Sequence, residues 1–120
     1  MLAPNIAVIT NGDMTTTLTS DAYQLTNVYG FAVQGVFTGT PMGTIKLQAS
    51  CDPPATSFLN TPAPTNWSDI GGSSQAISGA GNWLPNIIGG FYNWVRIVYT
   101  PTTPGSNAGT LNVRMNTKGI

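Results

Sequence analysis

Histidine and glutamate are absent from this chain of 120 residues, and charged side chains of any kind are scarce. Charged residues make up 7% of the sequence, where about 25% is usual in globular domains. General acid–base catalysis draws mostly on His, Glu, Asp and Lys, and a Ser-His-Asp triad or a Cys-His pair needs a histidine. No two aspartates form a paired motif; they are Asp13, Asp21, Asp52 and Asp69. We therefore expect a protein without enzymatic activity.

Cysteine is nearly absent as well, because Cys51 is the only one. A single cysteine cannot form an internal disulfide, and one cysteine without histidine cannot supply a zinc site. The glycine-rich stretches lack the Lys-Ser or Lys-Thr of a phosphate-binding loop, and the four basic residues are too dispersed for a nucleic-acid patch. We expect no metal, no cofactor and no nucleic-acid partner. Cys51 continues the inward-facing positions of a strand and is predicted to be a small buried hydrophobe.

Long apolar runs are also missing. No stretch approaches the roughly 18 residues that a membrane helix needs. Met1-Leu2-Ala3-Pro4 carries neither the basic cluster nor the apolar run of a secretory signal. The sequence therefore predicts a chain that is made in the cytoplasm and does not span a membrane. Its formal net charge of zero leaves little repulsion between copies, which favours self-association.

Strand-forming residues dominate what is present. The clearest alternation runs from Thr44 to Cys51, where every second residue from Ile45 is apolar, as a half-buried strand requires. Asn11-Gly12-Asp13 lies between two β-rich runs, 6–10 and 14–20, and is predicted to form the turn of a hairpin. The other main strands are expected at Tyr29–Thr40, Asn66–Ile70, Phe91–Thr100 and Gly109–Lys118.

These patterns predict the fold class. About seven or eight short strands, with turn signals about every 8 to 12 residues and no helical period, are typical of an all-β, antiparallel two-sheet sandwich. Both an immunoglobulin-like sandwich and a jelly roll fit the pattern. We expect a single domain over residues 1–120, in which residues 1–10 form an N-terminal arm or an edge strand.

Arg96 is unusual because it lies within the most apolar strand. A buried arginine needs a partner for its charge, and Asp52 and Asp69 are the natural candidates. We predict a structural ion pair that pins strand ends together. A ligand contact is the alternative role for Arg96.

Several aromatic residues lie in polar surroundings rich in Asn, Ser and Gly. Trp67, Trp83 and Tyr92, together with Trp94, are expected to pack in the core or in an interface. The alternative is a stacking platform for sugars, because an aromatic face suits the apolar side of a pyranose ring and nearby Asn and Thr side chains supply hydrogen bonds.

Four segments carry a combined pattern: Ile45–Asp52, Asn66–Ile70, Trp94–Thr100 and Gly109–Val113, followed by Lys118-Gly119. A strand ending in Ser-x-Asp precedes Trp-Ser-Asp, then a strand with Arg before Val-Tyr-Thr, then Gly-Thr-Leu. This order, over residues 29–119, resembles short β-sandwich structural proteins of bacteriophage virions.

The resemblance implies a capsid decoration, spike or tail component of the virion. Such a protein is present in many symmetric copies, docks on copies of itself and on other virion proteins, and has no enzymatic activity. The matching positions look architectural, so no functional residue is carried over. We therefore expect a non-enzymatic structural protein of a bacteriophage particle, with a glycan-binding module for host-surface attachment as the alternative.

Overall fold

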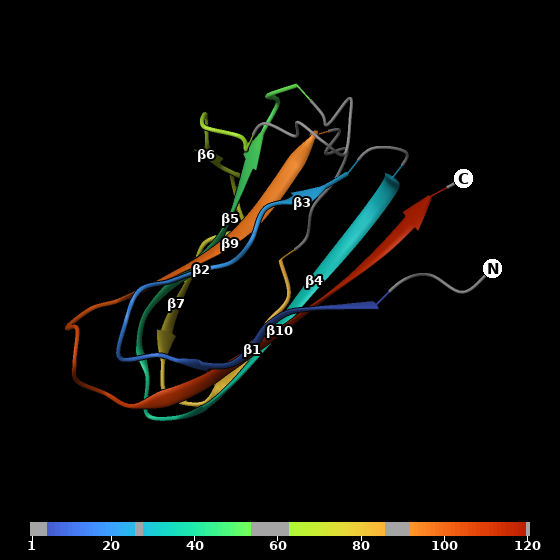
Figure 1. Ribbon diagram of the computed structural model, residues 1–120. Coiled ribbons are helices and arrows are strands. Elements are labelled where there is room, and N and C mark those ends of the chain that lie inside the picture. Colours follow the sequence, from blue (N-terminus) through green and yellow to red (C-terminus); the bar gives the residue numbers. More distant parts are fainter. Residues whose placement is uncertain (1–4, 26–27, 54–62, 86–91, 120) are drawn as a thin grey trace.

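The computed structural model describes residues 5–25, 28–53, 63–85 and 92–119, and within these ranges every regular element is a β-strand (Figure 1). The strands are β1 (Asn5–Asp13), β2 (Leu18–Thr19), β3 (Tyr23–Gln24), β4 (Val28–Gly39), β5 (Met42–Ser50), β6 (Ser68–Asp69), β7 (Gln75–Ser78), β8 (Gly81–Trp83), β9 (Trp94–Pro101) and β10 (Gly109–Gly119). The predicted all-β fold is confirmed. No helix in the described ranges is long and apolar enough to cross a membrane.

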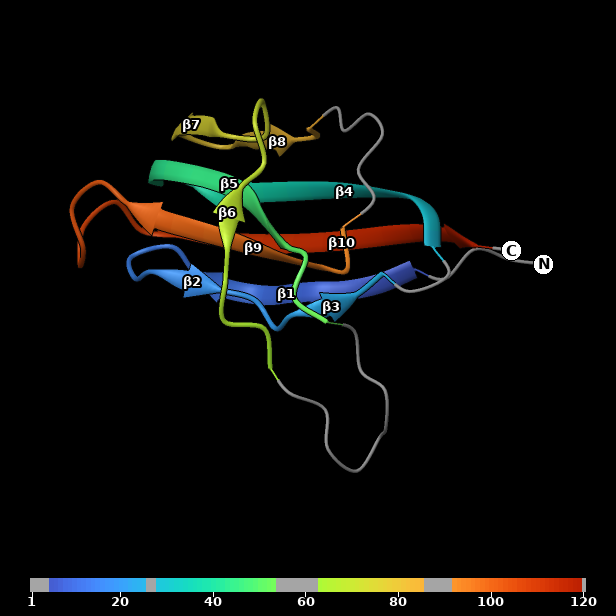
Figure 2. The same cartoon turned by 90° about the horizontal axis from the view of Figure 1, so that it is seen from above.

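The strands form two antiparallel sheets. Sheet A has the order β1-β10-β4-β8, and sheet B has the order β2-β9-β5-β6, with β3 also paired to β9 and β7 also paired to β5. The short strands β2 and β3 share one position and β6 and β7 share another, so the ten described strands occupy eight positions. Figure 2 shows pairs of strands that are neighbours in sequence but belong to different sheets. The two strands of a pair lie at the same level, such as β4 with β5 and β10 with β9.

This strand order decides between the two predicted sandwiches. Numbered by position, sheet A reads 1-8-3-6 and sheet B reads 2-7-4-5, because the chain changes sheet at almost every connection. That is the order of an eight-stranded jelly roll built from two Greek keys. The protein is therefore a jelly roll and not an immunoglobulin-like sandwich.

The core lies between the two sheets and is filled by the inward faces of their long strands. Ile45, Leu47 and Ala49 are buried there, as the alternation of their strand predicts. The other buried residues of the long strands are Val33, Phe37, Val95, Ile97, Tyr99, Leu111, Val113 and Met115. Trp83 of β8 is 1% exposed and completes this core beside Gly35. A Cβ atom on Gly35 would lie 3.3 Å from Cε3 of Trp83, so the absence of a side chain there makes room for the indole ring.

The predicted hairpin at Asn11-Gly12-Asp13 is wrong. These residues belong to β1, whose pairing with β10 shifts register between Ile9 and Gly12, and Asn11 has a φ of 51°. Asparagine tolerates this left-handed conformation in a β-bulge as well as in a hairpin turn. The turn follows at Asp13, whose carboxylate accepts hydrogen bonds from the backbone N–H and the hydroxyl of Thr15. The chain then crosses to sheet B, where Leu18–Thr19 pairs with β9.

Residues 5–10 belong to β1, which lies at one edge of sheet A and pairs along β10 from Asn5↔Asn116 to Asp13↔Thr110. Ile6, Val8 and Ile9 of this strand pack partly against the core. The part of the proposed arm formed by residues 1–4 lies outside the described residues.

Candidate functional site

The chain between Ala63 and Asp69, here called the 63–69 segment, runs across the strand direction before it enters β6 (Figure 2). It packs on the outer face of sheet B, where its Trp67 ring lies over the guanidinium group of Arg96, with 4.2 Å from the guanidinium carbon to the ring centroid. Two segments that are distant in sequence therefore meet at this face. Such a cation–π contact is worth about 0.5–1 kcal/mol when it is exposed to solvent.

Arg96 does not form the predicted ion pair with Asp52 or Asp69. Its Nε donates a hydrogen bond of 2.8 Å to Oε1 of Gln48, the residue directly opposite on β5. Among the described residues the ion pair that forms joins Lys46 Nζ to Asp69 Oδ2 at 3.0 Å. The direct pair does not form because Gln48 lies between Arg96 and Asp69. Its Nε2 also donates a hydrogen bond of 2.9 Å to Asp69 Oδ1.

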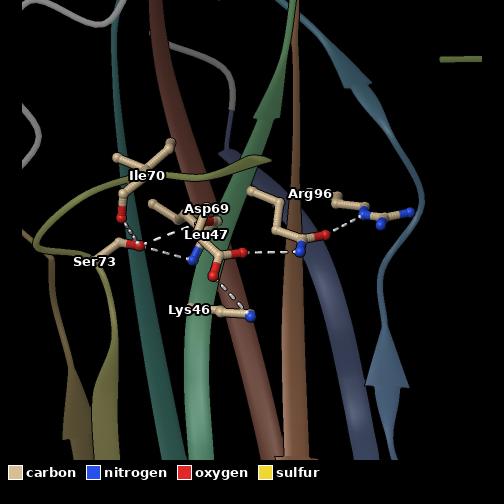
Figure 3. Close-up of polar contacts among 7 residues, drawn as sticks. Lys46, Leu47, Asp69, Ile70, Ser73 and Arg96 are labelled. Carbon is tan, nitrogen blue, oxygen red and sulfur yellow. Dashed lines mark hydrogen bonds and ion pairs between the residues drawn. The ribbon is translucent and has the colours of Figure 1, made fainter. Parts of the chain in front are cut away.

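These contacts form one chain of polar groups across β9, β5 and β6 (Figure 3). The hydrogen bond from Gln48, followed by the contact with Lys46, lowers the pKa of Asp69 below its ordinary value. Partial desolvation lowers the pKa of Arg96, which still leaves it protonated at neutral pH. The neutral amide of Gln48 therefore lies between the opposite charges of Arg96 and Asp69, where the sequence predicted a direct ion pair.

Asp52 holds the same segment from its other end. Its Oδ2 accepts backbone N–H bonds from Thr65 at 2.7 Å and Asn66 at 3.0 Å, and its Oδ1 accepts from Nδ2 of Asn66 at 2.9 Å. The side-chain bond from Asn66 is the largest cause of a lowered pKa at Asp52, and the two backbone bonds add to it. Asp52 therefore acts as a clamp on the 63–69 segment and stays ionised at neutral pH.

Ser73 is a structural residue that no sequence pattern singles out. It is 2% exposed, and its Oγ donates to the Ile70 carbonyl at 2.7 Å and accepts from the Leu47 N–H at 3.1 Å (Figure 3). Its carbonyl accepts a bond of 2.8 Å from Nε1 of Trp83. A serine in a loop is ordinary, and only the pairing of the loop with β5 reveals this role.

The predicted aromatic contacts separate into three environments. Trp83 packs in the core, one of the two positions expected for it, so it does not serve as an interface or glycan contact. Trp67 is half-buried, stacks on Arg96 and donates from Nε1 to the Pro64 carbonyl. Tyr92 is half-buried at the edge of the core and lines a groove.

This groove has a volume of about 430 Å³ and lies between the end of β5, the 66–71 stretch and Tyr92. Its lining residues are Ala49, Ser50, Cys51, Asp52, Asn66, Ser68, Asp69, Ile70, Gly71 and Tyr92. Cys51 is exposed here, so its predicted burial is wrong. The alternation of β5 ends with two successive buried residues, Ala49 and Ser50. The Ser50 hydroxyl then accepts the N–H of Asp52, and the chain leaves the sheet.

We expect thermal stability to change little between about pH 8 and pH 5 and to fall below about pH 4. No histidine titrates in the first range. The pKa values of Asp13, Asp52 and Asp69 are lowered by hydrogen bonds in the folded state. Their contribution is complete above the unfolded value of about 3.9 and is lost as pH falls through the folded values.

Thermal melts between pH 8 and pH 2.5 measure this effect. An Asp52→Asn variant should be less stable than the wild type at pH 7, and the difference should shrink as the pH falls and Asp52 takes up a proton. A constant difference between the two proteins over the whole range would contradict the clamp by an ionised carboxylate.

The geometry defines a jelly-roll domain with a clamped segment and a shallow groove on one face. No family model and no curated protein matches the sequence. Solved structures with a similar fold include the SPBc2 prophage-derived protein YomS, at 10% identity and a TM-score of 0.53, over 98% of this chain and 96% of that chain. PirA is similar at 15% identity and a TM-score of 0.51, over 97% and 93% of the two chains. These similarities show a shared fold.

Proposed function

We propose that this protein is a non-enzymatic structural component of a bacteriophage particle, in which it works through protein–protein interfaces. Three observations support the proposal: the strand pattern that resembles virion proteins, the fold shared with a prophage-derived protein, and the outer face of sheet A. The protein would be made in the host cytoplasm and reside in the virion as a decoration, spike or tail component.

The outer face of sheet A is the observation that carries the proposal. Amide and small side chains meet in register across its strands, as in the row Ala7, Arg114 and Gln34 and the row Asn112, Val36 and Asn82. Arg114 at its centre donates from a terminal nitrogen to Oδ1 of Asn5 at 2.7 Å. Apart from Arg114 the residues of these rows are uncharged, and protein interfaces are depleted in charged residues but enriched in arginine.

Exposed apolar side chains interrupt the amide rows. Val36 is 45% exposed and Leu84 is 65% exposed. Leu84 borders a small hollow of about 160 Å³ together with Asn5, Ala32, Gln34 and Arg114. A face with apolar side chains and little charge suits contact with a neighbouring protein of the particle.

A Val36→Lys substitution is expected to lower the number of copies in purified particles by at least about tenfold, because a loss of about 1.4 kcal/mol in binding has that effect. The added charge would have to be buried without a partner. Quantitative mass spectrometry of nuclease-treated particles, with the main shell protein as reference, measures the copy number. Melting temperatures of the isolated variants show whether folding is intact.

Met42→Lys is a matched control. Met42 is 42% exposed, close to the exposure of Val36, but it lies on sheet B. This variant should enter particles normally. Equal incorporation of both variants would exclude the outer face of sheet A as the interface. Absence of the wild-type protein from particles would overturn the proposed function.

A further inference from the structure

The groove beside Tyr92 has the dimensions of a small-ligand site. Its volume of about 430 Å³ falls within the range of about 300–1,000 Å³ that is usual for such sites. The apolar and aromatic residues of its lining include Ala49, Ile70 and Tyr92, and the polar ones include Asp52 and residues of the 66–69 stretch. Nothing in the proposed assembly function requires a groove at this position.

The polar groups of the groove retain free hydrogen-bonding capacity. Within the described residues, Asp52 Oδ1 accepts a bond from Asn66, the Ser50 hydroxyl also acts on the Asp52 carboxylate, and the two oxygens of Asp69 accept from Gln48 and Lys46. Each carboxylate oxygen has room for about two bonds. The Ser68 hydroxyl makes no hydrogen bond within the described residues, and it is exposed at the groove wall.

These groups select one kind of ligand. The carboxylates of Asp52 and Asp69 line the groove with no basic residue in the lining, and Lys46 balances the charge of Asp69 from outside it. Carboxylate oxygens accept hydrogen bonds, so the groove favours ligands that donate them. No three His, Cys, Asp or Glu residues of the described chain gather where they could hold a metal ion. A ligand with several hydroxyl donors and one apolar face matches both the carboxylates and the Tyr92 ring.

We propose that the groove binds a neutral saccharide ring, with Tyr92 against its apolar face and Asp52, Asp69 and Ser68 accepting or exchanging hydrogen bonds with its hydroxyls. The contacts differ from the aromatic platform suggested by the sequence, because Trp83 is buried and Trp67 is stacked on Arg96. The Asp52 clamp fixes Asn66 before a ligand arrives, which reduces the entropy lost on binding.

Cys51 provides a reporter, because it is the only cysteine, it is exposed and it lines the groove. The experiment measures the rate at which a maleimide alkylates Cys51 in the intact purified protein. Neutral hexoses, N-acetylhexosamines and their disaccharides are added one at a time. At least one sugar should slow alkylation by about threefold or more and should saturate, as expected for weak binding in the millimolar to micromolar range.

Two variants test the site and a third serves as control. Ser68→Leu fills the groove wall and Tyr92→Leu removes the ring while it keeps apolar packing, so both should abolish the protection of Cys51. Ser74→Leu changes an exposed serine outside the groove and should keep it. Circular dichroism and melting temperatures confirm that each variant is folded.

Protection of Cys51 decides whether the groove is a saccharide site. Failure of every neutral sugar to slow alkylation, or protection that persists in Ser68→Leu, would overturn the proposal. Protection by Ca²⁺ alone, by a simple amine or by an acidic sugar in place of neutral ones would also overturn it. The measurement uses the isolated protein, so its result does not depend on whether the protein is found in particles.

Discussion

Trp83→Ala should lower the free energy of unfolding by about 3–5 kcal/mol, the usual cost of removing a large aromatic side chain from a core. Trp83 is 1% exposed, packs against Gly35 and donates its indole N–H to the Ser73 carbonyl. The substitution therefore leaves a cavity between the sheets and removes the hydrogen-bond donor of the Ser73 carbonyl. Urea denaturation followed by circular dichroism measures the loss.

Trp67→Ala is the matched control, because the same side chain is removed from the surface. Trp67 is half-buried and contributes a cation–π contact with Arg96 and one hydrogen bond to Pro64. We expect a loss of about 1–2 kcal/mol, the sum of a contact of this kind and a typical hydrogen bond. Similar losses for the two tryptophans would contradict their placement in different environments.

The faces of the long strands could be predicted from the sequence because strand periodicity is local. In β5, β9 and β10 an inward residue occurs at every second position. The alternation from Ile45 predicts the burial of Leu47, and Ile97 and Val113 are fully buried with the same period. This signal ends where the strand ends. Cys51 continues the apolar alternation by one position, but β5 stops at Ser50, so the thiol is exposed.

The partner of Arg96 could not be predicted, because it depends on which strands are neighbours and in which register. Arg96 lies opposite Gln48, and Gln48 lies opposite Asp69 on its other side. Forty-eight residues separate Arg96 from Gln48 in sequence. The charged residues Arg96, Asp52 and Asp69 do lie in one region of the molecule, as predicted. The amide of Gln48, however, connects Arg96 to Asp69 in place of a direct ion pair.

Arg96 and its two predicted ion-pair partners, Asp52 and Asp69, all contact or anchor the 63–69 segment. Asp52 binds the backbone of Thr65 and Asn66, Arg96 lies under Trp67, and Asp69 connects the end of the 63–69 segment to β5. Half of the acidic residues of the chain therefore hold one segment against sheet B. This fixed segment forms one wall of the groove, so its rigidity and the proposed saccharide site have the same origin.

Gly43→Ala should be the second strongly destabilising change, with a loss of about 3 kcal/mol, the upper part of the range for overpacking a core. Gly43 lies opposite Pro101 in the pairing of β5 with β9. A Cβ atom there would overlap the Thr100 carbonyl and would lie 2.8 Å from the Tyr99 hydroxyl and 2.9 Å from the Pro101 Cα. Two of these neighbours are backbone atoms of a paired strand, which cannot move without breaking the ladder.

Gly71→Ala provides the comparison, because no atom lies within 4 Å of the Cβ that it would add. Its expected effect is within about 0.5 kcal/mol, as for most surface substitutions. A double-mutant cycle with Tyr99→Phe tests the steric cause. Tyr99 is fully buried, and its hydroxyl lies 3.2 Å from the carbonyls of Met14 and Met42. Removing this hydroxyl should cost less in the Gly43→Ala background than in the wild type, because it also relieves part of the overlap. Equal costs in both backgrounds would show that Gly43 is needed for its backbone and not for the space beside Tyr99.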